Sequence, residues 1–242
     1  MDDAAVNDAN SAAKLDTLPH YPDHQKLLEY RDQSGTVHAI KSTKDWEKRR
    51  AHILLGMQEV MGPLPRDRVP LDMRIEETTD DGTFLRHRIS YQAEPGDRVP
   101  AYLLVPKELQ KRAPAALCLH QTVAIGKGEP VGLGGRTTLR YAKELADRGY
   151  ICLAPDYPSF GDYQYDFKND RYISGTMKAI FNNIRGVDLL TEWPEVDPKR
   201  IACIGHSLGG HNTLFTCASS HGLALWFPLV ALRLLASTTA GT

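Results

Sequence analysis

The 242-residue sequence lacks several features that would point to a functional class at once. Its 29 basic and 30 acidic side chains almost cancel, so we expect no general electrostatic attraction to nucleic acid or to an anionic membrane. No stretch reaches the ~18 apolar residues of a membrane span. The segment Met1–Ala5 is acidic and has no apolar core, so no signal peptide is visible and a cytoplasmic location is expected.

Cysteine and metal-ligand patterns are also scarce. The four cysteines show no C-x-x-C spacing and fall in apolar runs, which predicts buried thiols and suits a reducing compartment: Cys118, Cys152, Cys203 and Cys217. His20 and His24 have helical metal-ligand spacing, but Pro22 between them disfavours a helix, so no metal is expected. The glycines of residues 126–135 match neither G-x-G-x-x-G nor G-K-[ST], which weakens a nucleotide-binding interpretation and favours a mobile loop near the site.

What is present predicts one α/β domain over residues 21–218, between a disordered tail (1–20) and an atypical apolar tail (219–242). A helix is expected over 43–61, followed by an antiparallel meander of strands at 72–79, 84–92 and 98–105. Apolar runs then alternate with helical patterns, which indicates a mostly parallel sheet with helices on both faces. The predicted strands are 115–119, 150–154 and a strand through Ile201, with helices at 137–148 and 175–192.

The main functional signal is the pentapeptide Gly205–Gly209, a G-x-S-x-G pattern between a predicted strand and a predicted helix. This context predicts a nucleophile elbow with Ser207 in a strained, exposed conformation. The two glycines are expected because side chains there would collide as strand and helix close together. Leu208 begins the helix, so its backbone N–H is expected to point at a developing oxyanion.

Two loops follow predicted parallel strands at the edge where open α/β sheets bind ligands. In the first, the N–H of Gln121 or Thr122 is a candidate second oxyanion donor, while His120 has a strand-capping role as an alternative to chemistry. The second loop, which contains Asp156 and Tyr157, is interpreted either as a pocket wall or as a loop held in place by its aromatic residues.

Residues from about 44 to 218 resemble the α/β-hydrolase superfamily, and within it the dienelactone hydrolase and acetyl xylan esterase-like branch. There is some likeness to the prolyl oligopeptidase-type fold. The resemblance implies a serine hydrolase that cleaves small-molecule carboxylic esters through an acyl-enzyme on Ser207, without a cofactor. It also implies the Leu208 N–H as an oxyanion donor. The residues that carry it are Leu117–Thr122, Gly149–Tyr157, Val196–Ile201 and Gly205–Gly210.

The sequence departs from this family after the elbow. The family's triad runs in the order Ser, Asp or Glu, His, but no Asp or Glu follows Ser207. Of the neighbouring histidines, His206 is expected to point away from the serine, His211 to pack or be solvated, and His221 lies in the apolar tail. We therefore expect a truncated or altered C-terminus, with the last strands of the sheet missing.

Two hypotheses follow. The chain is a serine esterase by descent whose activity is impaired, or it is an inactive pseudo-hydrolase or fragment that only binds a ligand or partner. An early end of the parallel sheet would expose an edge strand, so self-association is also expected.

Overall fold

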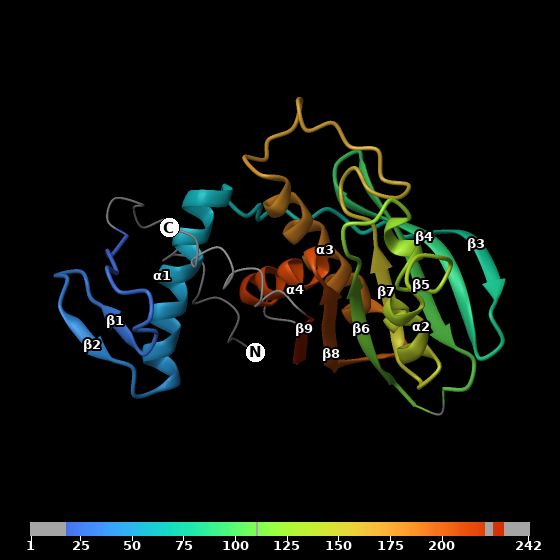
Figure 1. Ribbon diagram of the computed structural model, residues 1–242, viewed down its shortest axis with the longest axis horizontal. Coiled ribbons are helices and arrows are strands. Elements are labelled where there is room, and N and C mark those ends of the chain that lie inside the picture. The colour runs from blue at the N-terminus through green and yellow to red at the C-terminus, as the bar shows by residue number, and fades with distance from the viewer. Residues whose placement is uncertain (1–17, 110, 221–224, 230–242) are drawn as a thin grey trace, which may run out of the picture. The chain divides into compact units, whose positions relative to one another are not determined.

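The computed structural model describes residues 18–109, 111–220 and 225–229 (Figure 1). Two compact units make up the chain, Met1–Gly62 and Pro63–Thr242. The predicted domain of residues 21–218 therefore contains a unit boundary at Gly62–Pro63. Most of the predicted N-terminal tail, 1–17, lies outside the described residues. So do 221–224 and 230–242 of the predicted C-terminal tail.

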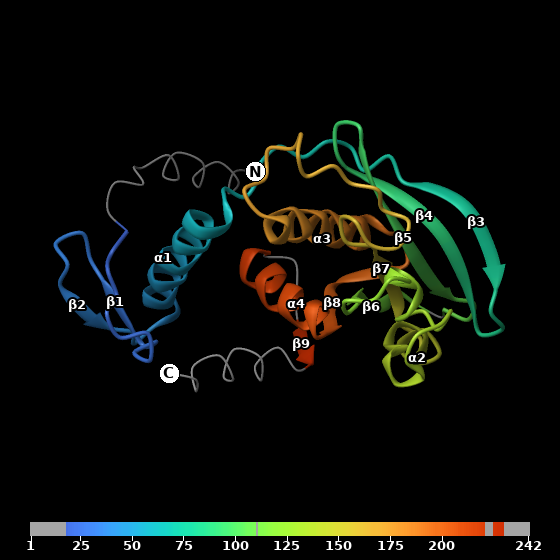
Figure 2. The same cartoon turned by 45° about the horizontal axis from the view of Figure 1, so that its top comes forward.

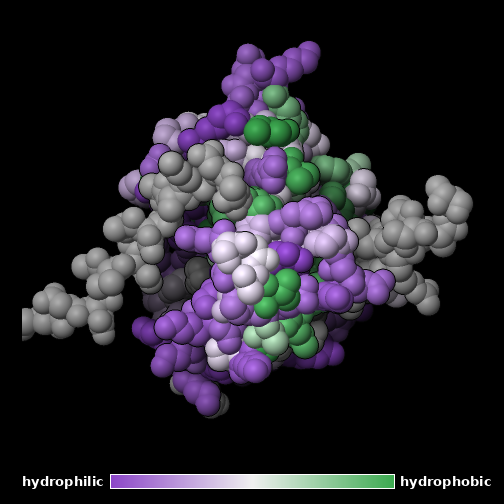
Figure 3. All heavy atoms as spheres, turned by 90° about the vertical axis from the view of Figure 1, so that its left-hand side faces the viewer, coloured by the Kyte–Doolittle hydropathy of each residue, from purple (hydrophilic) through white to green (hydrophobic). Residues whose placement is uncertain are grey.

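The first unit combines a small hairpin with one long helix. Strands β1 (Glu29–Arg31) and β2 (Val37–Ala39) pair antiparallel, and α1 covers Thr43–Met61, the residues predicted from the sequence. The helix begins there because the Ser42 hydroxyl accepts a hydrogen bond from the Asp45 N–H. It contacts β1 within this unit. Hydrophilic residues predominate on the face shown in Figure 3, with small groups of hydrophobic residues between them.

The second unit is built on a seven-stranded mixed sheet in the order β3-β4-β5-β7-β6-β8-β9. Strands β3 to β5 form the predicted antiparallel meander, and β7, β6, β8 and β9 are parallel. The strands span Arg74–Asp80 (β3), Phe84–Glu94 (β4), Asp97–Pro106 (β5), Ala113–Leu119 (β6), Ile151–Pro155 (β7), Val196–His206 (β8) and Leu225–Leu229 (β9).

Helices cover both faces of this sheet, as the apolar strand patterns predict (Figures 1 and 2). Alternate residues of β6 face opposite ways: Leu117 packs in the core with α3 (Gly175–Glu192), and Cys118 packs in the core with α2 (Tyr141–Ala146). Helix α4 (Leu208–Ser219) lies beside α3. All four cysteines are free thiols, three buried and Cys217 partly exposed.

Two details differ from the sequence-based expectation. The helix predicted over 137–148 is shorter and split, with a 3-10 turn at Thr137–Leu139 before α2, because Arg140 leaves the helical region at ψ 44°. Part of the apolar tail forms a strand, β9, parallel to β8. Pro228 lies in β9, the outermost described strand on that side, and edge strands accept proline more readily than central strands do.

The connections place a topological switch point between β6 and β8. The chain leaves β6 through α2 to β7 on one side, and then returns through α3 to β8 on the other side. Open α/β sheets bind ligands outside the carboxyl ends of the strands at such a point. No helix among the described residues is long and apolar enough to cross a bilayer.

Candidate active site

Ser207 occupies the sharp turn between β8 and α4. Its backbone has φ 53° and ψ −116°, a conformation that residues other than glycine rarely adopt. Strain of this kind costs about 1–3 kcal/mol and persists only where the surroundings enforce it. The predicted strained serine at the end of a central strand is therefore present, and its side chain is only partly buried.

The glycines on either side of the serine allow this turn, as predicted. A Cβ on Gly205 would lie 2.3 Å from the Gly209 carbonyl carbon and oxygen. A Cβ on Gly209 would lie 2.0 Å from the Leu119 carbonyl oxygen of β6. Both contacts are with backbone, which has little freedom to move. Strand β8, helix α4 and strand β6 thus approach one another so closely that only glycine fits at positions 205 and 209.

The N-terminus of α4 faces the same turn, since Leu208 is its first residue and the His211 N–H already bonds the Ser207 carbonyl oxygen at 3.0 Å. The N–H groups of a first helical turn have no acceptor within the helix, and the helix dipole is positive there. This arrangement can stabilise a negative charge that develops beside Ser207.

The loop after β6 lies next to the elbow because Leu119 is paired with Gly205. Gln121 is partly buried, and its Oε1 lies 3.1 Å from His206 Nδ1. Thr122 is exposed. The structure therefore brings Gln121 and the elbow together, and it places His206 against Gln121.

His120 is fully buried and serves as a connector between two strand ends. Its Nδ1 bonds the Gln121 carbonyl oxygen at 2.7 Å, and its Nε2 accepts from the Tyr157 N–H at 3.3 Å. The imidazole also packs on the Tyr157 ring, with centroids 4.3 Å apart. Because Nε2 accepts from an N–H, Nδ1 is the nitrogen that carries the hydrogen, and burial lowers the pKa of His120, which favours the same neutral form. These contacts match the strand-capping alternative.

Asp156 and Tyr157 point inward. The Asp156 carboxylate bonds Lys127 Nζ at 2.5 Å and the backbone N–H groups of Lys127 and Asp162 at 2.8 and 3.0 Å. Tyr157 is 3% exposed, and its hydroxyl is buried without a partner among the described residues. Their described contacts hold the loops after β6 and β7 together, which matches the interpretation of the second loop as a fixed one.

The histidines beside and after the serine are accounted for in part. His211 packs its ring edge-on against Phe215 at 4.5 Å, and burial lowers its pKa. Its Nδ1 is buried without a partner among the described residues. His221 lies outside the described residues. No cluster of His, Cys, Asp or Glu that could hold a metal ion is found in the part of the chain that the structure describes.

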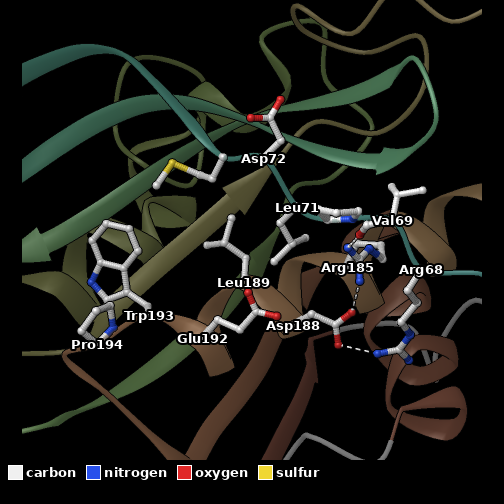
Figure 4. A pocket seen from close by; sticks show the side chains of 12 residues that line it. Arg68, Val69, Leu71, Asp72, Arg185, Asp188, Leu189, Glu192, Trp193 and Pro194 are labelled. Atoms are coloured by element: carbon white, nitrogen blue, oxygen red, sulfur yellow. Dashed lines mark hydrogen bonds and ion pairs between the residues drawn. The ribbon is translucent and has the colours of Figure 1, made fainter.

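A separate cavity of about 810 Å³ lies between the segment before β3 and the C-terminal half of α3 (Figure 4). Among the lining residues, Asp188 binds both Arg68 and Arg185 at 2.6 Å, and Leu71 and Trp193 contribute apolar surface. Helix α3 ends just before β8 begins, so this cavity is at the opposite end of the parallel strands from Ser207. No sequence signal indicates it, because its two walls are far apart in the chain.

Comparisons with known proteins agree with this geometry. The Prolyl oligopeptidase family model matches residues 138–223, which include Ser207. The chain is 28% identical over 173 residues to "Putative hydrolase YtaP" of Bacillus subtilis (strain 168), a match that covers 66% of this chain and 56% of YtaP. The chain thus spans little more than half the length of this relative.

Solved structures show the same fold at low identity. A "putative acetyl xylan esterase" from Bacteroides fragilis superposes with a TM-score of 0.64 at 17% identity, covering 76% of this chain and 53% of that one. A glucuronoyl esterase from Solibacter usitatus superposes with a TM-score of 0.60 at 17% identity, covering 84% of this chain and 62% of that one. At these identities the likeness establishes the fold.

Proposed function

The chain has the α/β-hydrolase fold, and we propose from this premise that it is a carboxylic ester hydrolase whose nucleophile is Ser207. The observation that carries the proposal is the strained turn at φ 53° between β8 and α4, which only Gly205 and Gly209 make sterically possible. Strain at a partly exposed serine, at the switch point of the sheet, is expected where a hydroxyl must reach a substrate.

The proposed reaction needs no cofactor. The Ser207 Oγ attacks the ester carbonyl carbon while its hydroxyl proton passes to a water molecule, and the carbonyl oxygen becomes an oxyanion. The N–H groups of Leu208 and Gln121 donate hydrogen bonds to that oxyanion. The intermediate collapses as its bond to the alcohol oxygen breaks, the departing alkoxide takes a proton from water, and an acyl group stays on Ser207. A second water molecule then attacks the acyl carbon, the bond to Ser207 Oγ breaks, and the acid leaves while Ser207 Oγ regains a proton. Small-molecule esters are the proposed substrates, and the names of the two structural neighbours make acetyl and glucuronoyl esters the first to test.

We further propose that a polypeptide of this sequence turns esters over slowly. A serine hydroxyl is a weak nucleophile until a base accepts its proton and a carboxylate orients that base. The sequence contains no Asp or Glu after Ser207. Loss of a triad member typically lowers kcat on the order of 10⁴-fold, while the oxyanion donors retain a residual activity. The second candidate function is therefore a binding module that keeps the elbow as architecture.

Labelling with a fluorophosphonate ester, measured by intact mass, tests the proposal. A mass gain that is lost in Ser207→Ala would establish an activated serine, whereas absence of labelling in a folded sample would favour the binding module. A turnover rate typical of esterases, lost in the same variant, would contradict the proposed impairment. Ser220→Ala is a matched control, since it makes the same change at a serine outside the elbow.

A further inference from the structure

Three polar side chains form a continuous chain of hydrogen bonds beside the nucleophile elbow. Glu129 follows a short 3-10 helix at Gly126–Gly128, Gln121 follows β6, and His206 is the last residue of β8. Glu129 Oε1 accepts from Gln121 Nε2 at 3.1 Å, and Gln121 Oε1 lies 3.1 Å from His206 Nδ1. The side chain of Gln121 therefore bridges a buried carboxylate and the residue directly before Ser207.

The carboxylate at one end of this chain is fixed in place. Glu129 is 1% exposed, and its Oε1 also accepts from the Arg136 backbone N–H at 3.0 Å. A Cβ on Gly135, at φ +74°, would lie only 2.4 Å from the same oxygen. The backbone of residues 135–136 thus closes around Glu129 and leaves its carboxylate little freedom to turn.

The chemistry of the three groups sets the direction of the chain. Glu129 Oε1 accepts hydrogen bonds from the Arg136 N–H and from Gln121 Nε2, so the NH₂ group of Gln121 faces Glu129. The Gln121 carbonyl oxygen then faces His206, and because a carbonyl oxygen only accepts, His206 Nδ1 must carry the hydrogen. A neutral His206 is thereby fixed as its Nδ1–H tautomer, with its lone pair on Nε2.

We propose that Glu129 and Gln121 are positioning residues that fix the tautomer of His206 and fasten the loop after β6 to the elbow. Gln121 is tied through its side chain to the residue next to the nucleophile, so its backbone N–H is held at a constant distance from Ser207. An oxyanion donor must be in place before the charge develops if it is to stabilise that charge without reorganisation. The role of the Gln121 N–H as a positioned oxyanion donor rests on the proposed function, whereas the tautomer of His206 does not.

The tautomer can be measured directly by NMR. Long-range ¹H–¹⁵N spectra of ¹⁵N-labelled protein at about pH 8.5, where free histidine is neutral, distinguish protonated Nδ1 from protonated Nε2. His206→Asn identifies the signals. We expect the Nδ1–H form in the full chain and in Gln164→Met, a matched change at an exposed glutamine. We expect the Nε2–H form to gain population in Gln121→Met, because methionine keeps the length of the side chain but has no carbonyl oxygen to accept the hydrogen bond from His206 Nδ1–H.

Glu129→Met tests the direction of the chain. Methionine keeps the length of the side chain but removes the oxygen that accepts from Gln121 Nε2, so Gln121 becomes free to turn over and we expect both His206 tautomers. An Nε2–H form in the unaltered protein, or no change in Gln121→Met, would overturn the proposal. An unchanged tautomer in Glu129→Met alone would remove Glu129 from it.

The rate of fluorophosphonate labelling tests the consequence for Ser207. Removing an oxyanion donor costs about 10²–10³-fold, so a displaced donor in Gln121→Met should slow labelling by about tenfold. Equal rates in Gln121→Met and Gln164→Met would refute this consequence. If the unaltered protein is not labelled at all, the proposed function fails while the NMR experiment still decides the role of Glu129 and Gln121.

Discussion

The buried ion pair of Lys127 and Asp156 yields a sharp prediction about stability. Their side chains are 3% and 0% exposed, and the two charges are 2.5 Å apart. Gly126 and Gly161 close around the carboxylate, since a Cβ on either would lie 2.2–2.3 Å from Asp156 Oδ1. We predict that Asp156→Asn, which keeps the shape of the side chain, destabilises the second unit strongly.

The size of the effect follows from what remains in the variant. Breaking a buried pair by removing one charge typically costs about 3–5 kcal/mol, because the other charge stays buried without compensation. Lys127 keeps a second partner, Asp162, at 2.6 Å, but that side chain is 63% exposed. An ion pair with an exposed carboxylate contributes only about 0–1 kcal/mol to the free energy of unfolding. We therefore expect a loss of about 3 kcal/mol for Asp156→Asn and less than about 1 kcal/mol for Asp162→Asn.

Urea unfolding followed by circular dichroism measures the difference. With a slope of about 2 kcal/mol per molar, a loss of about 3 kcal/mol lowers the midpoint by roughly 1.5 M. Asp162→Asn is the matched control, since it makes the same chemical change in the other partner of the same lysine. If both variants unfold at the same urea concentration, the buried pair does not hold these loops and the reasoning is refuted.

Three further predictions concern the elbow, pH and assembly. Gly205→Ala should lower the free energy of unfolding by about 3 kcal/mol or more, because the new Cβ would collide with backbone atoms. Gly96→Ala, at φ +76° with open space around it, should lower it by about 1–2 kcal/mol. A lower urea midpoint for Gly96→Ala than for Gly205→Ala would contradict this. Burial lowers the pKa of His120 in the folded chain, so its contribution to stability is complete above the unfolded pKa of about 6.5 and is lost as the pH falls below that value. The drop in urea midpoint between pH 7.5 and 5.5 should shrink in His120→Gln, and an unchanged drop would refute the assignment. Because β9 is the outermost described strand beside β8, we also propose association through that edge, measurable as a mass that rises with concentration in light scattering; a constant monomer mass would count against it.

Local sequence patterns predict much of this fold because their physical causes are local. Helix α3 spans the predicted residues, since Ser174 caps it by accepting from the Met177 N–H. Strand β6 was predictable because burial on both faces requires an unbroken apolar run. The elbow was predictable for a similar reason: strand, glycine, serine and helix follow each other within a dozen residues. The β1–β2 hairpin was missed, because strands of three residues carry too little pattern.

Side-chain direction in loops was not predictable in the same way. The sequence places Asp156 after a strand at the ligand-binding edge, but whether it faces a substrate or the interior depends on Lys127, 29 residues earlier. The same holds for Lys178, which is fully buried and bonds Glu94 at 2.5 Å across 84 residues. A pairing between distant residues depends on how the elements between them pack, and one sequence does not contain that information in readable form.

The contacts that shape the carboxyl edge of the sheet do not depend on a catalytic base. Gly205 and Gly209 set the strain at Ser207, Glu129 and Gln121 fix the loop after β6, and the Lys127–Asp156 pair fixes the loops around it. A base instead changes the protonation of the serine as it attacks, and it contributes its own factor of about 10²–10⁴. Loss of the base alone should therefore lower labelling of Ser207 and leave the His206 tautomer and the urea midpoint unchanged. A folded chain with the Nδ1–H tautomer and an unlabelled serine would then have kept the geometry of a hydrolase and lost only its proton transfer.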